Sequence, residues 1–267
     1  MSKTKHERTI KKQLGQFMTP MELTRNIINE IQFIISDKVL EPSFGDGNFI
    51  IPLIDKFLPL YDDFFTINEK LDIILSENIY GVEYDMSLYH KTLQRIKEKY
   101  NYLPEKHNFF NNDYFEENFT VNFDYIIGNP PFGGSIRKEI DNMVEKKYGM
   151  RNKIKIKKET YCMFIIKSLD NLKKNGELLF ISSNTFLTIN TMKGLRNHLM
   201  LNGVNEINHL HFFSEETSYS MVILKHKNIE PITYIKVDDK KIHYSNINKT
   251  ENLSWHIPYE IVANWFQ

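Results

Sequence analysis

Two kinds of hydrophobic pattern alternate along the chain. Short runs rich in β-branched and aromatic residues predict strands, and segments with apolar residues at every third or fourth position predict helices. The predicted strands span residues 38–41, 78–83, 107–111, 123–128, 177–182, 207–212 and 221–226. The predicted helices span residues 24–35, 49–58, 87–100, 161–174 and 193–201. Asn175 and Gly176 form a glycine signal that is typical of a helix end, here the end of the fourth helix.

This alternation indicates the fold class. Strands that alternate with helices form βαβ units, which build a parallel sheet covered on both faces. We therefore expect a doubly wound, Rossmann-like α/β fold with a seven-stranded mixed sheet. Its last two strands, joined around 214–219, should form an antiparallel hairpin at the sheet edge. Another hairpin-like stretch covers 232–237 and 241–244, and an aromatic tail follows it.

Length and composition fit one large domain with a small appendage. The chain has 267 residues, 41% of them hydrophobic, which is enough for a sizeable packed core. No apolar run approaches the roughly 18 residues of a membrane span, and the basic start does not lead into a signal-peptide core. Cys162 is the only cysteine, which excludes a disulfide framework and a multi-cysteine metal site. We expect a cytoplasmic protein without a membrane partner.

Charge is unevenly distributed although 34 Lys and Arg balance 34 Asp and Glu. A net charge of zero argues weakly against nucleic acid as a partner. However, residues 1–12 carry a local charge of +4, and residues 137–158 carry nine cations against three acidic residues. Such runs are either solvated surface or a rim that contacts phosphates. The candidate DNA-binding residues of the second run are Lys153, Lys155, Lys157 and Lys158.

Polar residues with ligand-binding potential follow the first three predicted strands. Gly45 and Gly47 lie between a strand and a helix, where glycines let the backbone approach a ligand closely. Because the third glycine of the dinucleotide fingerprint is absent, the loop suits a nucleoside-like ligand without a phosphate. Glu83 ends the second strand and could accept hydrogen bonds from ribose hydroxyls. Asp113 follows the third strand and could accept from an exocyclic amine, with an aromatic ring packed beside a purine.

The fourth strand leads into Asn129, Pro130, Pro131 and Phe132. Two consecutive prolines make a rigid loop that presents carbonyl groups. The Asn129 side-chain carbonyl and the Pro130 backbone carbonyl can both accept from one planar amine, and Phe132 can stack on its ring. Two acceptors draw the nitrogen toward tetrahedral geometry, which frees its lone pair for attack.

Together these motifs resemble the gamma-class, TaqI-type DNA methyltransferases that modify adenine N6. The matching segments, in the order found in that family, are residues 15–20, 41–49, Glu83, Asp113 and 129–132. The resemblance covers about residues 13 to 226. It implies the class I S-adenosylmethionine-dependent methyltransferase fold, with 1–227 as the catalytic domain, 134–158 as a basic insertion and 228–267 as a short extension.

The resemblance also implies a role for each matching residue. S-adenosylmethionine would be the cofactor, and no metal would be needed. Its contacts would come from Phe17, Thr19, Pro20, Glu41, Pro42, Gly45, Glu83, Asp113, Tyr114 and Asn129. The catalytic group would comprise Asn129, Pro130, Pro131, Phe132 and Phe213. Phe213, with the neighbouring Phe212 as the alternative, would lie on the second face of a base flipped out of double-stranded DNA.

One departure from the family leaves alternatives open. Family members continue into a large target-recognition domain, whereas only about 40 residues follow the predicted edge hairpin here. A separate specificity subunit, a truncated chain or recognition by the basic insertion would each account for this. The chain could therefore be a modification subunit that is inactive without its partner. An RNA adenine or a protein glutamine is an alternative substrate, because a related tetrad occurs in those methyltransferases.

Overall fold

The computed structural model describes most of the chain up to residue 243. The described residues are 18–131, 135–151, 153–183, 186, 189–201, 204–210, 221–227, 234–237 and 240–243. The helices are α2 (Met21–Asn29), α3 (Ile50–Phe57), α4 (Ile67–Ile73), α5 (Met86–Tyr100), α6 (Lys138–Tyr148), α7 (Thr160–Asn171) and α9 (Lys193–Leu201). Shorter helical turns cover Leu58–Leu60, Ile74–Asn78 and Asn190–Met192. Within these ranges no helix has both the length and the apolar composition that crossing a membrane requires.

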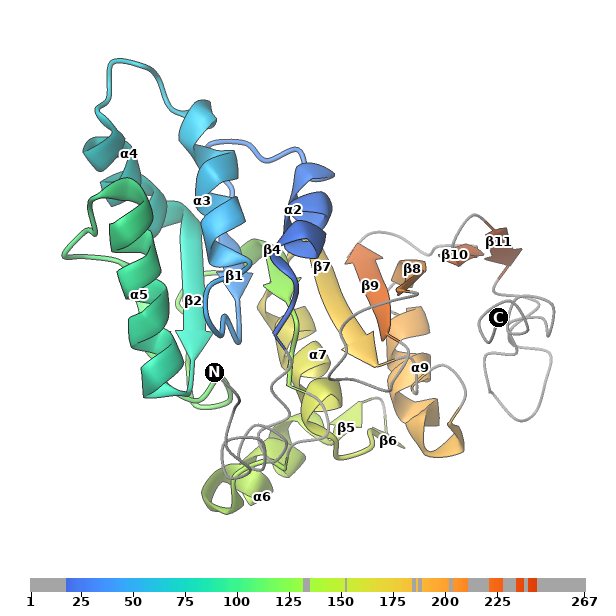
Figure 1. Cartoon of the computed structure of the whole chain (residues 1–267). Helices are drawn as coiled ribbons and strands as arrows, with labels where there is room; N and C mark the ends of the chain where they lie inside the picture. Colours follow the sequence, from blue (N-terminus) through green and yellow to red (C-terminus); the bar gives the residue numbers. More distant parts are fainter. Residues whose placement is uncertain are drawn as a thin grey trace, which may run out of the picture.

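The strands form one large sheet and a small separate hairpin. The large sheet contains β1 (Val39–Glu41), β2 (Ile79–Glu83), β3 (Asn108–Asn111), β4 (Phe123–Gly128), β7 (Leu172–Ser183), β8 (Val204–Leu210), β9 (Met221–Lys227), β10 (Tyr234–Val237) and β11 (Lys240–His243). The small hairpin pairs β5 (Met150–Arg151) with β6 (Ile154–Lys155). In Figure 1 the arrows of β2 and β7 point toward the side of the molecule where α6, β5 and β6 lie.

The strand order confirms an α/β fold with a mixed sheet. The order is β11-β10-β8-β9-β7-β4-β1-β2-β3. The five strands from β3 to β7 are parallel, and β9 pairs antiparallel with both β7 and β8. All three residues of β1 are buried, as are the last three of β4. Consecutive buried residues are typical of strands covered on both faces.

The expectation of seven strands is wrong, because the sheet has nine strands within the described residues alone. The hairpin expected near 232–244 is present as β10 and β11, and β10 pairs in parallel with β8. The antiparallel pair β8–β9 therefore does not end the sheet. An edge strand leaves a row of backbone N–H and C=O groups unpaired, and β10 pairs with that row.

The helix end predicted at Gly176 is also wrong. Helix α7 ends at Asn171, and β7 begins at the next residue. The pairing of β4 with β7 shifts between Leu172 and Glu177, so the intervening residues form a bulge in the strand. A Cβ atom on Gly176 would lie 2.8 Å from the carbonyl oxygen of Phe123. The glycine therefore serves close approach between strands, a role that glycine in strands often has.

Two helices were missed, and one helix was misplaced. Helix α4 lies between the predicted helix 49–58 and the predicted strand 78–83. It begins with a capping box, in which Thr66 and Glu69 satisfy each other's backbone N–H groups. Helix α6 occupies half of the basic insertion. Helix α2 begins at Met21, directly after Pro20, and ends at Asn29 rather than residue 35. Proline fits this position because a helix start leaves its first N–H groups unbonded.

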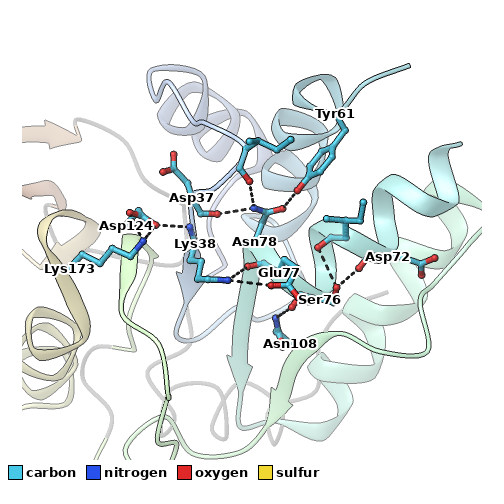
Figure 2. Close-up of polar contacts among 12 residues, drawn as sticks. Asp37, Lys38, Tyr61, Asp72, Ser76, Glu77, Asn78, Asn108, Asp124 and Lys173 are labelled. Atoms are coloured by element: carbon cyan, nitrogen blue, oxygen red, sulfur yellow. Dashed lines mark hydrogen bonds and ion pairs between the residues drawn. The ribbon is translucent and has the colours of Figure 1, made fainter. Parts of the chain in front are cut away.

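A buried polar network fixes the sheet at the amino ends of its central strands (Figure 2). The Asn78 side-chain amide donates to the carbonyl oxygens of Ile35 and Asp37, both at 2.9 Å, and accepts from the Tyr61 hydroxyl. Figure 2 also shows Asp124 of β4, which accepts from the Lys38 backbone N–H at 2.8 Å. The network joins four segments that lie far apart in sequence. It therefore fixes the amino ends of β1, β2 and β4 relative to one another, and this alignment extends to their carboxyl ends.

This network predicts a graded loss of stability. Asn78→Ala removes three hydrogen bonds, two of them buried, and leaves their partners unpaired, so we expect the free energy of unfolding to fall by about 2–4 kcal/mol. Tyr61→Phe removes one of these bonds, and we expect a loss of about 1 kcal/mol. Urea unfolding measures both, with the exposed Asn118→Ala as the control. Equal stabilities of the Asn78 and Asn118 variants would contradict a structural role of the network.

Candidate functional site

A pocket lies where the carboxyl ends of the parallel strands meet. Its volume is about 1050 Å³, including the space open to solvent at its mouth. Nine of the predicted site residues line it: Thr19, Glu41, Pro42, Gly45, Glu83, Asp113, Tyr114, Asn129 and Pro131. The ends of β1, β2 and β4 and the loop after β3 contribute to the lining, which is the usual location of ligands in open α/β sheets.

The remaining predicted site residues fall into two groups. Phe17, Phe132 and Phe213 lie outside the described residues. Pro20 is exposed at the start of α2, and Pro130 is buried; neither is among the residues that line the pocket. Among the residues that the structure describes, no three His, Cys, Asp or Glu side chains are grouped as a metal ion would require.

The glycine loop after β1 has a backbone conformation that few residues other than glycine adopt. Gly45 and Gly47 have φ angles of 57° and 84°. A Cβ atom on Gly47 would lie 2.8 Å from the Thr92 side chain, so α5 packs closely against the loop. The Thr92 hydroxyl donates to the Gly45 carbonyl oxygen at 2.9 Å. The loop is therefore held in place from α5, and its Gly45 backbone faces the pocket.

Glu83 supports the same loop from β2. Its carboxylate accepts from the backbone N–H of Gly45 at 2.8 Å and from that of Asp85 at 2.7 Å. The side chain is 4% exposed. Burial raises the pKa of Glu83 to about 7, although the two backbone hydrogen bonds oppose this increase. The two backbone hydrogen bonds thus fix the position of the carboxylate. Its negative charge is energetically costly because the group is buried.

Glu41 is a second buried carboxylate at the pocket. It is 1% exposed and accepts from the Ser43 backbone N–H at 3.1 Å. Burial raises the pKa of Glu41 well above its ordinary range, and the nearby charge of Glu83 contributes. A Cβ atom on Gly128, the last residue of β4, would overlap the Glu41 carboxylate. Two buried carboxylates favour a ligand that brings positive charge or hydrogen-bond donors.

Asn129 is oriented by the segment that precedes α2. Its side-chain nitrogen donates to the Thr19 hydroxyl oxygen at 3.1 Å. Thr19 is itself held by Asn48, whose side-chain nitrogen donates to the Thr19 carbonyl oxygen at 2.8 Å. The Ser43 hydroxyl donates to the Asn129 backbone carbonyl at 3.2 Å. Because the Asn129 side-chain nitrogen contacts Thr19, the side-chain oxygen points away from the Thr19 hydroxyl.

Asp113 is paired with a residue that the sequence analysis had counted only as part of the basic run. Oδ2 of Asp113 accepts from Nε of Arg137 at 2.8 Å, and Oδ1 accepts from the Phe115 backbone N–H at 2.9 Å. The same guanidinium pairs with Glu116. No spacing in the sequence shows which of nine nearby cations reaches Asp113.

Side chains of α7 also hold the loop after β3 in place. The Tyr114 hydroxyl lies 3.1 Å from the Ser168 hydroxyl, so the ring reaches into the core. Lys167 is 3% exposed and donates to the backbone carbonyl oxygens of Tyr114 and Glu117. Burial lowers the pKa of Lys167 to about 8. Lys167 was not predicted as a site residue, although a lysine within an apolar helix face signals a buried polar partner.

The four predicted DNA-binding lysines differ in their pairing. Lys157 pairs with Glu159, and Lys158 pairs with Asp141 and Glu145 of α6. Lys153 and Lys155 are exposed on the β5–β6 hairpin, and neither forms an ion pair within the described part of the chain. Of these four lysines, the two on the hairpin therefore present charge that no acidic side chain among the described residues already balances.

Comparison with known proteins finds relatives among restriction–modification enzymes. The family model described as Eco57I restriction-modification methylase matches residues 61–219. The type II methyltransferase M.HincII of Haemophilus influenzae is 29% identical over an alignment of 259 residues, which covers 92% of this chain and 44% of that protein. The chain thus spans less than half the length of this curated relative. These matches confirm the family resemblance that the sequence motifs indicated.

Solved structures share the fold. A modification subunit of a putative type I restriction enzyme from Vibrio vulnificus YJ016 has a TM-score of 0.67 at 18% identity, and the match covers 98% of this chain and 55% of that one. A putative class I S-adenosylmethionine-dependent methyltransferase from Listeria monocytogenes has a TM-score of 0.62 at 16% identity, covering 96% and 73%. At these identities the likeness concerns the fold alone, and it confirms the expected class I methyltransferase fold.

The raised pKa of Glu83 predicts a pH dependence of stability. The pKa of Glu83 is about 7 in the folded protein and 4.5 in an ordinary setting. Between these values the folded state binds more protons than the unfolded state, so the free energy of unfolding falls as pH rises, by about 3 kcal/mol. Glu83→Gln should reduce this slope, because it removes one of the two buried carboxyl groups whose pKa is raised. Urea unfolding from pH 4.5 to 8 measures the slope, with the exposed Glu98→Gln as the control. A Glu83→Gln slope equal to that of the wild type would refute the assignment.

Proposed function

The chain belongs to the Eco57I restriction-modification methylase family, and from this premise we propose that it methylates the N6 amine of an adenine in DNA. The observation that carries the proposal is that Glu41, Glu83, Asp113 and Asn129, which end or follow four different strands, line one pocket. Such convergence provides both a cofactor site and a site for the accepting amine. S-adenosylmethionine is the proposed methyl donor.

The donor and acceptor groups of the pocket fit this cofactor. Glu41 and Glu83 offer buried carboxylates for an amino group and for ribose hydroxyls, and Asp113 offers an acceptor for the adenine amine. The Gly45 backbone allows close approach, while the loop lacks the third glycine of a pyrophosphate-binding fingerprint. When bound, the cofactor supplies an electrophilic methyl group on a sulfonium sulfur. The chain itself supplies binding, orientation and exclusion of water.

Asn129 and Pro130 are the proposed acceptors for the target amine. The Asn129 side-chain carbonyl and the Pro130 backbone carbonyl would each accept one amine hydrogen. Hydrogen bonds of this kind strengthen as the nitrogen gains positive charge during attack, so they stabilise the transition state more than the ground state. Thr19 supports this role because its hydroxyl accepts from the Asn129 side-chain nitrogen. This contact orients the amide so that its carbonyl oxygen faces away from Thr19.

The target base would leave the double helix before it reacts. An amine within stacked bases is inaccessible to a pocket, so enzymes that modify bases extrude the nucleotide. Phe132 and Phe213 remain the proposed stacking residues for the flipped adenine. The exposed lysines of the β5–β6 hairpin are proposed contacts to DNA phosphates.

A second proposal concerns how the enzyme selects its target. The structural neighbour from Vibrio vulnificus is described as a modification subunit of a putative type I restriction enzyme. By analogy, we propose that 1–227 form the catalytic domain and that 228–267 dock onto a recognition domain or a separate specificity subunit. Site-specific methylation by the isolated chain would contradict the need for a separate subunit.

Replacing Asn129 tests the proposed chemistry. We expect Asn129→Ala to lower kcat/KM for methylation of duplex DNA by about 100-fold or more, because one acceptor of the target amine is lost. Labelled S-adenosylmethionine reports incorporation, and digestion to nucleosides identifies the product as N6-methyldeoxyadenosine. Asn118→Ala, an exposed site, should keep wild-type activity. Unchanged incorporation by the Asn129 variant, or a labelled product other than methyldeoxyadenosine, would contradict the proposal.

The pairing of the insertion lysines predicts which of them bind DNA. Substituting both Lys153 and Lys155 with Gln should reduce the salt slope of DNA binding by about 1–2, since each phosphate contact contributes about 0.9 to the slope. Substituting Lys157 and Lys158 with Gln removes the same charge from residues already paired with acids, and should change the slope less. Fluorescence anisotropy across salt concentrations compares the pairs. Equal slopes for the two double variants would overturn this distinction.

A further inference from the structure

Arg137 lies at the junction between the pocket and the basic insertion. It immediately precedes α6, and its carbonyl oxygen accepts from the Ile140 backbone N–H in the first turn of that helix. At the other end of α6, the Tyr148 ring lies 6.0 Å from the Phe115 ring, measured between centroids. Both ends of α6 are therefore joined to the loop that carries Asp113 and Phe115.

The contacts of Arg137 hold its guanidinium against the pocket wall. Nε donates to Asp113 at 2.8 Å, and another nitrogen of the fork pairs with Glu116. The guanidinium carbon lies 5.1 Å from the centre of the Tyr84 ring, a distance typical of cation–π contacts. Tyr84 directly follows Glu83, and Arg137, Tyr84 and Asp113 all line the pocket. The guanidinium thus joins the ends of β2 and β3.

Asp113 keeps acceptor capacity in this arrangement. An ionised carboxylate offers about four lone-pair sites. The Phe115 N–H uses one site on Oδ1, and Arg137 uses one site on Oδ2. An amine donor can therefore bind Asp113 while the Arg137 contact stays in place.

We propose that Arg137 is a positioning residue of the cofactor pocket, which holds Asp113 as the acceptor for an exocyclic amine and thereby selects a purine nucleoside with an amino group over one with a 6-oxo group. The inference rests on the proposed function, since it assigns the adenine end of the same pocket. It explains why a residue of the basic insertion lies in the pocket lining. The fork geometry is specific to arginine, because lysine is unable to join both Asp113 and Glu116 through a planar group.

The test compares two ligands that differ at one substituent. S-adenosylhomocysteine carries the amine, and S-inosylhomocysteine carries a carbonyl oxygen in its place. Isothermal titration calorimetry on the full chain should show tighter binding of the amine ligand, by about 10- to 100-fold, because the carbonyl oxygen faces a carboxylate. Arg137→Met should reduce this ratio at least about fivefold. Arg137→Lys should restore part of it.

Arg151 provides a matched control within the same insertion. It pairs with Asp170 and does not line the pocket. Arg151→Met removes the same charge and the same fork, and we expect it to leave the ligand ratio within about twofold of wild type. Urea unfolding of both methionine variants separates a loss of selectivity from a loss of folded protein.

Other outcomes overturn the proposal in distinguishable ways. A similar loss of affinity for both ligands would reduce Arg137 to a structural role. Tighter binding of S-adenosylhomocysteine to the Arg137→Met variant would mean that the arginine competes for Asp113. Equal wild-type affinities would remove Asp113 as the amine acceptor. Absence of binding of either ligand to the wild type would contradict the proposed function itself.

Discussion

The pocket depends on one close contact between neighbouring parallel strands. The Glu41 carboxylate at the end of β1 lies against the backbone of Gly128 at the end of β4, where any side chain would overlap it. Asn129 follows Gly128 directly, so the same contact sets the distance between the buried carboxylate and the loop with two prolines. The wall of the proposed cofactor site and the proposed site of amine recognition are therefore coupled through a single glycine position.

The two ends of the parallel strands have different roles: residues at the amino ends stabilise the fold, and residues at the carboxyl ends form the pocket. At the amino ends, the buried Asn78 side chain pairs its amide nitrogen with two backbone carbonyl groups and its amide oxygen with the Tyr61 hydroxyl, which stabilises the fold. At the carboxyl ends, Glu41 and Glu83 are buried with only backbone donors, and the pKa of each is raised. Burial of carboxylates without cations costs stability that a ligand with suitable donors can restore. The network at the amino ends offsets part of that cost in stability. The carboxyl ends can therefore keep their buried carboxylates in position for binding.

The sequence predicted most of the parallel sheet and the convergence of its strand ends, because apolar runs and strand-terminal motifs are local signals. It failed where tertiary pairing decides. Gly176 carries the same local signal in a helix end and in a strand bulge, and only the pairing of β4 with β7 distinguishes them. Strands β10 and β11 extend the sheet because β10 pairs with β8, and no local pattern in the sequence reveals that pairing. The capping box at Thr66 could have been predicted from its local sequence. The partner of Asp113 could not, because Arg137 lies 24 residues away among similar cations.

Charge in the basic insertion shows how pairing changes a sequence-based count. The run holds nine cations, but four of them pair with acidic side chains: Arg137, Arg151, Lys157 and Lys158. Four of their acidic partners lie outside the run, so counting within the run overstates the field that it projects: Asp113, Glu116, Glu159 and Asp170. Within the described residues, the unbalanced charge includes the exposed lysines of the β5–β6 hairpin. Sequence therefore bounds the charge of a segment, and ion pairing decides how much of that charge can meet a phosphate.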